Sequence, residues 1–200
     1  MSNTTNPSFP IRLGTRSSPL AMVQAEQVRA RLCEAHGWGK EAIELVPVVA
    51  SGDKVQDRPL AEIGGKALWT KELDEWLGEG RIHASVHSLK DVETLRPAAF
   101  TFGAFLERAD RRDRLIGATS LASLAPGARL GTSAPRRAAQ ALNLRPDLEV
   151  VSLRGNVATR LAKLEAGDVA ATFLAAAGLD RLGQHDAGVA VAGAGDLDVE

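Results

Sequence analysis

The tetrapeptide RLGT occurs twice in this chain, at residues 12–15 and 129–132, and both copies lie in the same local context. A short apolar run leads into each copy, and serine, proline and an amphipathic stretch follow within a few residues. Four matching letters alone could arise by chance, but a strand, a glycine turn and a capped helix in succession form the repeating unit of an α/β fold. The matched context therefore favours two similar α/β lobes over coincidence.

The rest of the chain keeps this alternation of short apolar runs and helical stretches. Apolar residues recur at helical spacing in several segments, so we expect helices at residues 18–38, 67–80, 133–144 and 156–167. The shorter apolar runs predict strands at residues 11–15, 43–50, 82–89, 128–132, 148–155 and 168–179. We expect Asn156 to cap the last of these helices and Gly167 to end it.

The charged cluster ERADRRDR, residues 107–114, separates the two cycles of strands and helices. We place the boundary between the lobes there, with a first lobe over residues 1–107 and a second over residues 108–200. The segment 51–66 combines glycines, charges and a proline. Loops of about 15 residues inside compact domains are usually functional or disordered, so we expect a mobile loop here.

Arginines gather where predicted strands end and predicted helices begin. They are Arg16, Arg136, Arg137, Arg154, Arg160 and Arg181. A glycine turn into a helix leaves free backbone N–H groups and the positive end of the helix dipole, and both favour anions. The guanidinium fork adds bidentate recognition of carboxylates or phosphates. A single arginine of this kind is often a solvated surface residue, but the whole set predicts a cleft for a small ligand with several acid groups.

Composition excludes several other classes of protein. The formal net charge is −1 at pH 7 and aromatic residues make up 4% of the chain, which argues against a nucleic-acid partner. No apolar run approaches the roughly 20 residues of a membrane helix, and MSNTTNPSFP lacks the pattern of a secretory signal. The single cysteine, Cys33, fits a reducing compartment, so we expect a cytoplasmic protein. No Cys/His spacing predicts a metal site, and no Walker or GxGxxG loop predicts a nucleotide site.

The segment VHSLKDVE, residues 86–93, places a cation and an anion side by side at Lys90 and Asp91, after an apolar run. An incidental surface pair would be worth only about 0–1 kcal/mol. Two kinds of function remain open at this point: an enzyme, or a two-lobed binding module for a carboxylated small molecule without catalysis. The adjacent pair favours the enzyme, because a receptor for polyanions gains nothing from an anion at its centre.

The chain resembles the hydroxymethylbilane synthase (porphobilinogen deaminase) family over about residues 11–183. The ordered motifs that carry the resemblance are RLGTRSSPLAMVQA, IELVPVVASGD, GGKALWTKELDEWL, IHASVHSLKDV, GTSAPRRAAQ, SLRGNVATRLAKLEAG and AAAGLDRLG. The family's fold consists of two α/β lobes like those of periplasmic binding proteins, with a cleft between them, and a third, smaller α+β domain. Its members are transferases of porphyrin and haem biosynthesis. They join four porphobilinogen molecules head to tail into the linear tetrapyrrole hydroxymethylbilane, with release of ammonia.

The resemblance also implies roles for individual residues. Asp91 matches the catalytic aspartate, which nearby cations should keep ionised. The family's dipyrromethane cofactor would contact Ser88, Lys90, Asp91, Ser133, Arg136, Arg137 and Arg160. Substrate carboxylates would contact Arg16, Ser18, Arg154, Arg160 and Arg181. Residues 51–66 would form a lid over the cleft, and no metal is implied.

The sequence departs from the family's pattern in one important respect. The family attaches its cofactor through a thioether to a cysteine in the third domain, whereas Cys33 lies in a different motif, RLCEAHGW. After Gly183 the resemblance fades into an atypical tail, so we expect the third domain to be missing. Without the attachment thiol, we do not expect turnover by this polypeptide alone. The resemblance otherwise implies a cytoplasmic monomer whose partner is the small molecule porphobilinogen.

Overall fold

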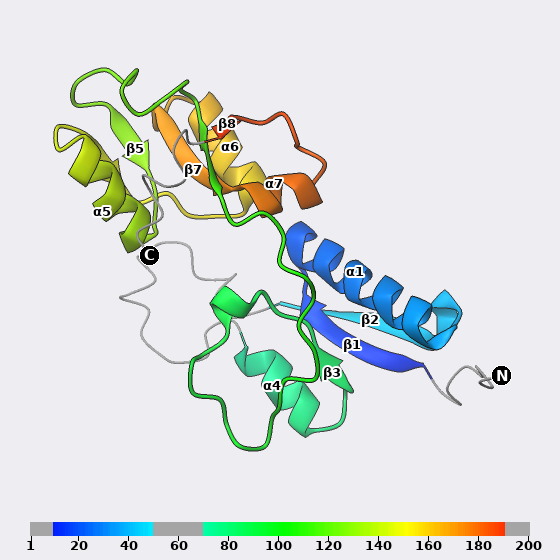
Figure 1. Ribbon diagram of the computed structural model, residues 1–200. Helices are drawn as coiled ribbons and strands as arrows, with labels where there is room; N and C mark the ends of the chain where they lie inside the picture. Colours follow the sequence, from blue (N-terminus) through cyan, green and yellow to red (C-terminus); the bar gives the residue numbers. More distant parts are fainter. Residues whose placement is uncertain (1–9, 50–69, 191–200) are drawn as a thin grey trace. The chain divides into compact units, whose positions relative to one another are not determined.

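The computed structural model describes residues 10–49 and 70–190, and these residues form two compact units (Figure 1). Unit 1 comprises residues 10–49 and 70–107, and unit 2 comprises residues 108–190. Each unit packs helices against a β-sheet, which confirms the predicted α/β class. Within the described residues, no helix combines the length and the apolar character that crossing a membrane requires.

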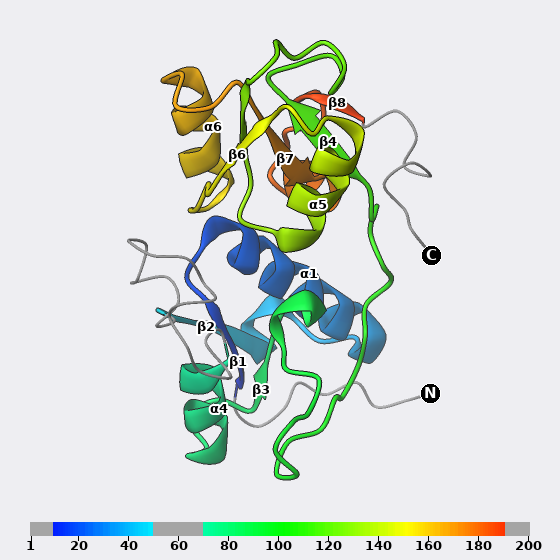
Figure 2. The same ribbon diagram turned by 90° about the vertical axis from the view of Figure 1, so that its left-hand side faces the viewer.

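Unit 1 contains a three-stranded parallel sheet in the order β2-β1-β3. Its strands are β1 (Ile11–Arg16), β2 (Ile43–Val48) and β3 (Ala84–Ser85). Its helices are α1 (Pro19–His36) and α4 (Lys71–Gly78), with short 3₁₀ turns η1 (Lys40–Ala42) and η2 (Leu89–Asp91). The two helices cover opposite faces of the sheet, as both ribbon views show (Figure 2).

Alternation along β1 explains this two-sided packing. Leu13 points to the face covered by α1 and packs with Ile43 and with Val28 of the helix. Gly14 points to the other face, where a Cβ atom would lie 2.4 Å from Ile82 Cδ1 and 2.8 Å from Leu73 Cδ2. Successive strand residues face opposite sides of a sheet, so a glycine in β1 lets α4 and its neighbours approach closely.

Unit 2 contains a five-stranded mixed sheet in the order β6-β5-β7-β4-β8. Its strands are β4 (Asp113–Ile116), β5 (Arg129–Gly131), β6 (Glu149–Val151), β7 (Ala171–Ala175) and β8 (Val189–Ala190). Its helices are α5 (Pro135–Leu144), α6 (Val157–Glu165) and α7 (Ala176–Arg181). Strand β5 is parallel to both β6 and β7, whereas β4 is antiparallel to β7 and β8.

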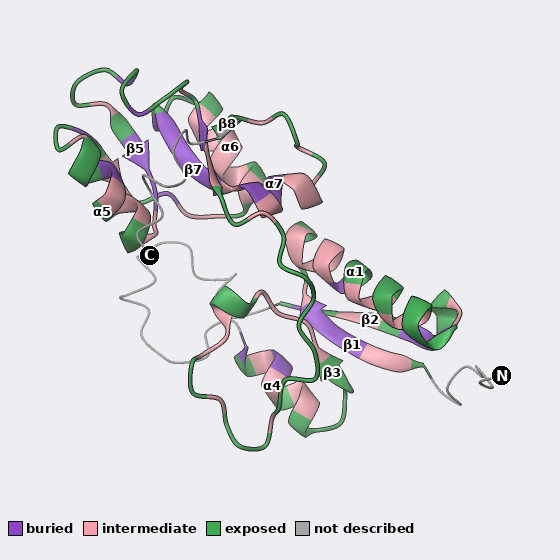
Figure 3. Ribbon diagram, in the orientation of Figure 1, coloured by how far each residue is buried: buried purple, intermediate pink, exposed green. Residues whose placement is uncertain are grey.

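The buried interior of unit 2 also lies on both faces of its sheet (Figure 3). Phe173 of β7 belongs to a cluster with Ala141 of α5, and the next residue, Leu174, belongs to a second cluster with Leu161 of α6. The same alternation occurs in β4, where Leu115 and Ile116 join different clusters. Helices α5 and α6 therefore cover opposite faces.

The helix boundaries agree with the local signals in the sequence. Ser18 caps α1, and Asn156 caps α6 by accepting a hydrogen bond from the Thr159 N–H at 2.9 Å. Helix α1 ends at a left-handed Gly37 (φ 65°), and Gly167 (φ 79°) follows the end of α6. The predicted cap and stop of α6 are confirmed, since both depend on chemistry within a few residues.

Several predicted strands are shorter than expected, and one prediction was wrong. The run 168–179 is not a single strand, because β7 ends at Ala175 and the chain turns into α7. Alanine, glycine and leucine have no β-branched carbon, and alanine has the highest helix propensity, so this segment need not stay extended. The run 82–89 forms only the two-residue β3 before the η2 turn. The strands β4 and β8 were not predicted.

Candidate functional site

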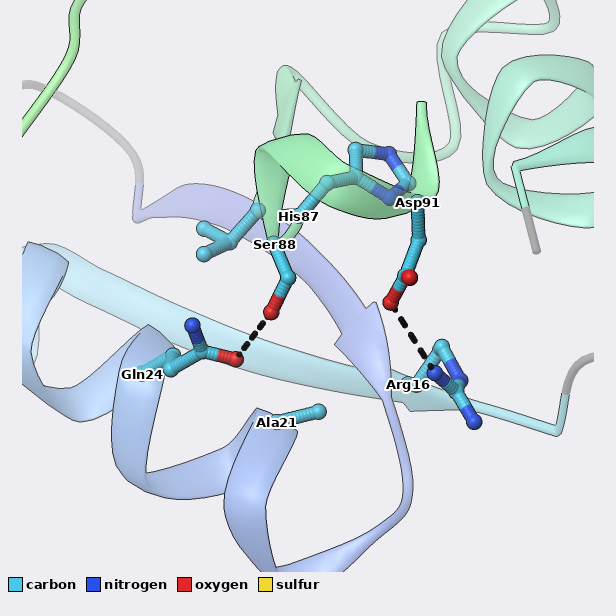
Figure 4. Close-up of a pocket in the computed structure, with 7 residues that line it drawn as sticks. Arg16, Ala21, Gln24, His87, Ser88 and Asp91 are labelled. Carbon is cyan, nitrogen blue, oxygen red and sulfur yellow. Dashed lines mark hydrogen bonds and ion pairs between the residues drawn. The ribbon is translucent and has the colours of Figure 1, made fainter. Parts of the chain in front are cut away.

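The pocket in unit 1 lies at the edge of the sheet where β1 and β3 end and α1 begins (Figure 4). Because β1 and β3 are parallel, their carboxyl ends meet at the same edge. The residues that line the pocket are Arg16, Ala21, Gln24, Val86, His87, Ser88 and Asp91. Three of the residues predicted to act in the site, Arg16, Ser88 and Asp91, are thus brought together.

Asp91 faces Arg16 across this pocket. The Arg16 Nη1 and Asp91 Oδ2 atoms lie 3.7 Å apart, and the two side chains are 21% and 26% exposed. An ion pair of this length in a partly exposed setting is loose, so a ligand can insert between its members or share them. Asp91 is therefore a carboxyl side chain that lies beside a cation and has access to the pocket.

The backbone around Asp91 differs from the predicted strand end. Residues Leu89–Asp91 form the η2 turn, which Ser88 begins, and the Asp91 N–H donates to the Ser88 carbonyl. Lys90 lies on the exposed side of this turn and is not one of the residues that line the pocket. Lys90 and Asp91 therefore point in different directions because they lie in a 3₁₀ turn, and not because side chains alternate along a strand.

Two pocket residues, Gln24 and His87, were not predicted as functional. Gln24 Oε1 accepts a hydrogen bond from the Ser88 hydroxyl at 3.0 Å. Gln24 lies one turn after Leu20 and one turn before Val28, within the predicted apolar stripe of the helix. A polar side chain in such a stripe requires a partner, and this signal could have identified it.

His87 is the second of these residues. Its Nε2 atom is buried and has no hydrogen-bond partner among the described residues. Burial lowers the pKa of His87, Asp74 acts in the opposite direction, and Arg96 lowers the pKa further. The imidazole is therefore held in its neutral form beside Asp91.

Unit 2 brings together a second group of predicted site residues. Burial lowers the pKa of Arg160, and the neighbouring cations Arg137 and Arg154 lower it further. The Arg160 Nε–H donates to the Gly155 carbonyl at 3.0 Å, at the start of α6. Cations that converge beside a helix N-terminus repel one another, and an anion bound among them would relieve this repulsion.

Asp113, at the start of β4, already engages two of the predicted arginines. Its carboxylate accepts two hydrogen bonds from Arg137, at 2.9 and 2.5 Å, and one from Arg136 at 3.2 Å. The Ser133 hydroxyl donates to the Leu153 carbonyl at 2.9 Å. Arg136 remains largely exposed, whereas Arg137 is mostly buried.

The other predicted site residues lie at the ends of helices. Ser18 accepts the Ala21 N–H at 3.4 Å as the cap of α1, so its hydroxyl has a structural role. Arg181 is the last residue of α7, not a residue that follows a strand. The loop 51–66 lies outside the described residues. The described residues contain no group of three or more side chains that could hold a metal ion.

Comparisons with known proteins identify the family to which the chain is similar. The family profile described as porphobilinogen deaminase, dipyromethane cofactor binding domain, matches residues 11–194. The porphobilinogen deaminase of Sphingopyxis alaskensis is 62% identical over 193 residues, covering 94% of this chain and 61% of the relative. Those of a Caulobacter species and of Nitrobacter winogradskyi are 51% and 53% identical, cover 87% of this chain, and are themselves covered to 57% and 56%. The chain thus spans a little over half of the length of these relatives.

Proposed function

The chain belongs to the porphobilinogen deaminase family, and we propose that it forms the cofactor- and substrate-binding part of a transferase of tetrapyrrole biosynthesis. The reaction would join four porphobilinogen molecules head to tail into hydroxymethylbilane, with release of one ammonia per molecule. The observation that carries the proposal is Asp91, a carboxylate that faces a pocket beside Arg16. The alternative, a binding module without chemistry, is not favoured by relatives named as deaminases.

Asp91 suits the charge that develops during this condensation. The C–N bond of the protonated aminomethyl group breaks and ammonia leaves with the electron pair, so the methylene carbon and its pyrrole ring become electron-poor. A carbon of the next pyrrole then forms the new C–C bond and loses its proton. A fixed carboxylate beside the ring stabilises the positive charge and accepts hydrogen bonds from pyrrole N–H groups.

The arginines would hold the acetate and propionate groups of the substrate. We propose Arg16, Ser18, Arg154, Arg160 and Arg181 for this role. The support is strongest for Arg160, because its side chain is largely buried and the cations Arg137 and Arg154 act on it and lower its pKa. The hydroxyl of Ser18 already caps α1, which supports a contribution through the N-terminus of that helix rather than through its side chain alone.

A dipyrromethane, when bound, supplies the pyrrole to which the first substrate joins. Its own carboxylates suit the cation cluster around Arg160, so the residues present fit the group. We propose that Ser88, Lys90, Asp91, Ser133, Arg136, Arg137 and Arg160 hold it. We do not propose Cys33 as an attachment thiol, since it donates to the Gly39 carbonyl and packs from α1 against the cluster that contains Ile43 of β2.

We further propose two lobes, residues 1–107 and 108–200, related by duplication. The support is topological: the parallel strands follow the order β2-β1-β3 in unit 1 and β6-β5-β7 in unit 2, with an RLGT copy on each central strand. In both, one helix leads from the central strand to its first neighbour and a second helix leads to the other. The proposal includes lobes of the periplasmic-binding-protein type with a ligand cleft between them, and a cytoplasmic monomer.

The test of the function replaces Asp91 by asparagine, which keeps the shape of the side chain and removes its charge. In full-length enzyme we expect Asp91→Asn to lower the condensation rate by about 10²–10³-fold, the loss seen when one charge-stabilising group is removed from an active site. Ammonia release and hydroxymethylbilane formation measure the rate, and calorimetry with porphobilinogen measures binding. Arg16→Leu is the matched control, which should weaken binding instead. Unchanged turnover in Asp91→Asn would remove Asp91 from the chemistry.

A further inference from the structure

The turn that carries Lys90 and Asp91 is held from both ends by polar contacts with the helices of unit 1. At its beginning, the Ser88 hydroxyl donates to Gln24 of α1 at 3.0 Å. Two residues after Asp91, Glu93 reaches the opposite helix, α4, through Arg96 and Thr70. A 3₁₀ turn of three residues has little stability of its own, so these contacts decide where Asp91 lies.

The contacts on the α4 side form a closed network. The Arg96 guanidinium donates to both Asp74 oxygens, at 2.6 and 2.9 Å, and to Glu93 Oε2 at 2.8 Å. The Thr70 hydroxyl lies 3.2 Å from each Glu93 oxygen. The side chains of Arg96, Asp74 and Glu93 are 14%, 13% and 20% exposed, and Thr70 is fully buried. Such short, sheltered, bidentate pairs fix geometry far better than exposed ion pairs do.

The charges of this network act on the pocket. Hydrogen bonding to Asp74 raises the pKa of Arg96, although burial opposes this, and its hydrogen bond to Glu93 adds to the effect. Burial alone would raise the pKa of Glu93, but hydrogen bonds from its own backbone N–H, Arg96 and Thr70 lower it. Asp74, Glu93 and Arg96 also act on His87, which lines the pocket beside Asp91. Glu93 and Arg96 are therefore both charged at neutral pH, and the network lies within electrostatic range of the site.

We propose that Arg96, supported by Thr70, is a positioning residue that sets the place of Asp91 by fixing Glu93 to helix α4. The inference rests on the proposed function, because it concerns the same carboxylate. Arg96 is not one of the residues that line the pocket, so its effect passes through the backbone of residues 91–93. A residue of this kind should change how fast bound substrate reacts rather than how tightly it binds.

Thr70 offers a conservative pair of variants that isolates the contribution of its hydroxyl, which contacts Glu93 and Arg96. Thr70→Val keeps the shape and loses the hydroxyl, whereas Thr70→Ser keeps the hydroxyl. In full-length enzyme we expect Thr70→Val and Arg96→Gln to lower kcat by about 10–100-fold while KM changes less than about threefold. Thr70→Ser should restore kcat to near the wild-type value. If Thr70→Ser and Thr70→Val lose kcat equally, the hydrogen bond to Glu93 does not position the turn.

A readout on the 200-residue chain separates positioning from turnover. Arg96→Gln removes a cation that lowers the pKa of His87 and leaves Asp74 and Glu93, which raise it. We therefore expect an NMR titration to show a higher His87 pKa in Arg96→Gln than in the wild-type chain. An unchanged His87 titration would show that the network does not reach the pocket, and would overturn the proposal.

A destabilised control guards against a purely structural effect. Val28→Ala removes apolar contact on the α1 face of the sheet, away from the network. It should lower the melting temperature while keeping kcat, measured well below the melt. Equal loss of kcat in Val28→Ala and Arg96→Gln would overturn the positioning role. The proposed function and the positioning role fail on different results. Full activity of Asp91→Asn would contradict the proposed function. An inactive Asp91→Asn together with a fully active Arg96→Gln would contradict only the positioning role of Arg96.

Discussion

His87 shows how one buried titratable side chain couples the pocket to pH. Its neutral form is favoured chiefly by burial, with Asp74 and Glu93 raising its pKa and Arg96 and Arg16 lowering it. In the unfolded chain, an exposed histidine titrates near pH 6.5. Between the lowered pKa of His87 in the folded chain and pH 6.5, the unfolded chain therefore binds more protons than the folded one. Over this range the free energy of unfolding rises with pH.

We predict that this dependence disappears in His87→Phe. The wild-type free energy of unfolding should fall as pH drops below about 6.5, with a contribution from His87 of at most about 1.4 kcal/mol per pH unit. The phenylalanine has no proton to gain, so its curve should be flatter over the same range. Urea denaturation between pH 5 and 8 measures both curves. Parallel curves would mean that His87 does not titrate differently in the folded protein.

The residues of the site were predictable to the extent that a motif or a local rule singles them out. Arg16, Ser88 and Asp91 share one pocket, as expected of residues at the ends of parallel strands. Arg96 gave no such signal, because its partner Asp74 is 22 residues away in the sequence. No local sequence rule predicts a pair at that separation. His87 was similarly hidden, since its importance comes from a place in the pocket that only the fold creates, whereas Gln24 could have been identified as a polar residue in an apolar helix stripe.

At the scale of elements, the two RLGT glycines have the same steric role. A Cβ on Gly14 would lie 2.4 Å from Ile82 Cδ1, and one on Gly131 would lie 2.8 Å from Leu153 Cδ2. Each glycine lies in the central one of three parallel strands. Side chains from later parts of the chain pack directly against the backbone of this strand. The threonines that follow, Thr15 and Thr132, are buried as well.

We predict that Gly14→Ala and Gly131→Ala each destabilise the fold by about 1–3 kcal/mol, the usual cost of overpacking. Gly78→Ala is the matched control, because Gly78 lies at the end of α4, where a methyl carbon would have no atom within 4 Å. That change should be neutral or stabilise by up to about 1 kcal/mol. Chemical denaturation compares the three variants, and equal stability of all of them would contradict the steric account.

The elements themselves were predictable where local chemistry determines them. The cap at Asn156 is a short-range feature, and the sequence identifies it directly. Strands β4 and β8 depend on antiparallel pairing across the sheet of unit 2, so a local pattern does not reveal them. The segment after Ala175 could be strand or helix by its apolar content alone, and its lack of β-branched residues, together with the packing of Leu179 with Leu174 of β7, favours α7.

At the scale of the whole molecule, each compact unit has its own interior. Among the described residues, two apolar clusters belong to unit 1 and two belong to unit 2. The parallel trio of strands is common to both units, and β4 and β8 extend the sheet of unit 2. Units with separate cores can unfold in separate steps.

The positions of the tryptophans make this separation measurable. Trp38 and Trp76 lie in unit 1, and no tryptophan follows Trp76 in the sequence, so tryptophan fluorescence does not report on residues 108–190, whereas far-ultraviolet circular dichroism reports on both units. We therefore predict that the two signals give different thermal midpoints in the wild-type chain, because a single midpoint requires that both units unfold together.

Core substitutions assign each transition to a unit. Leu73 in α4 is 2% exposed and Phe173 in β7 is 1% exposed, so Leu73→Ala should cost about 2–5 kcal/mol and Phe173→Ala about 3–5 kcal/mol. Leu73→Ala should lower the fluorescence midpoint and leave one dichroism transition in place. Phe173→Ala should lower the midpoint of one dichroism transition and leave the fluorescence midpoint in place. The reason is that unit 2, which loses core contacts, contains no tryptophan. Identical shifts of both signals in both variants would mean that the chain unfolds as one cooperative body, since damage to either core would then melt the other.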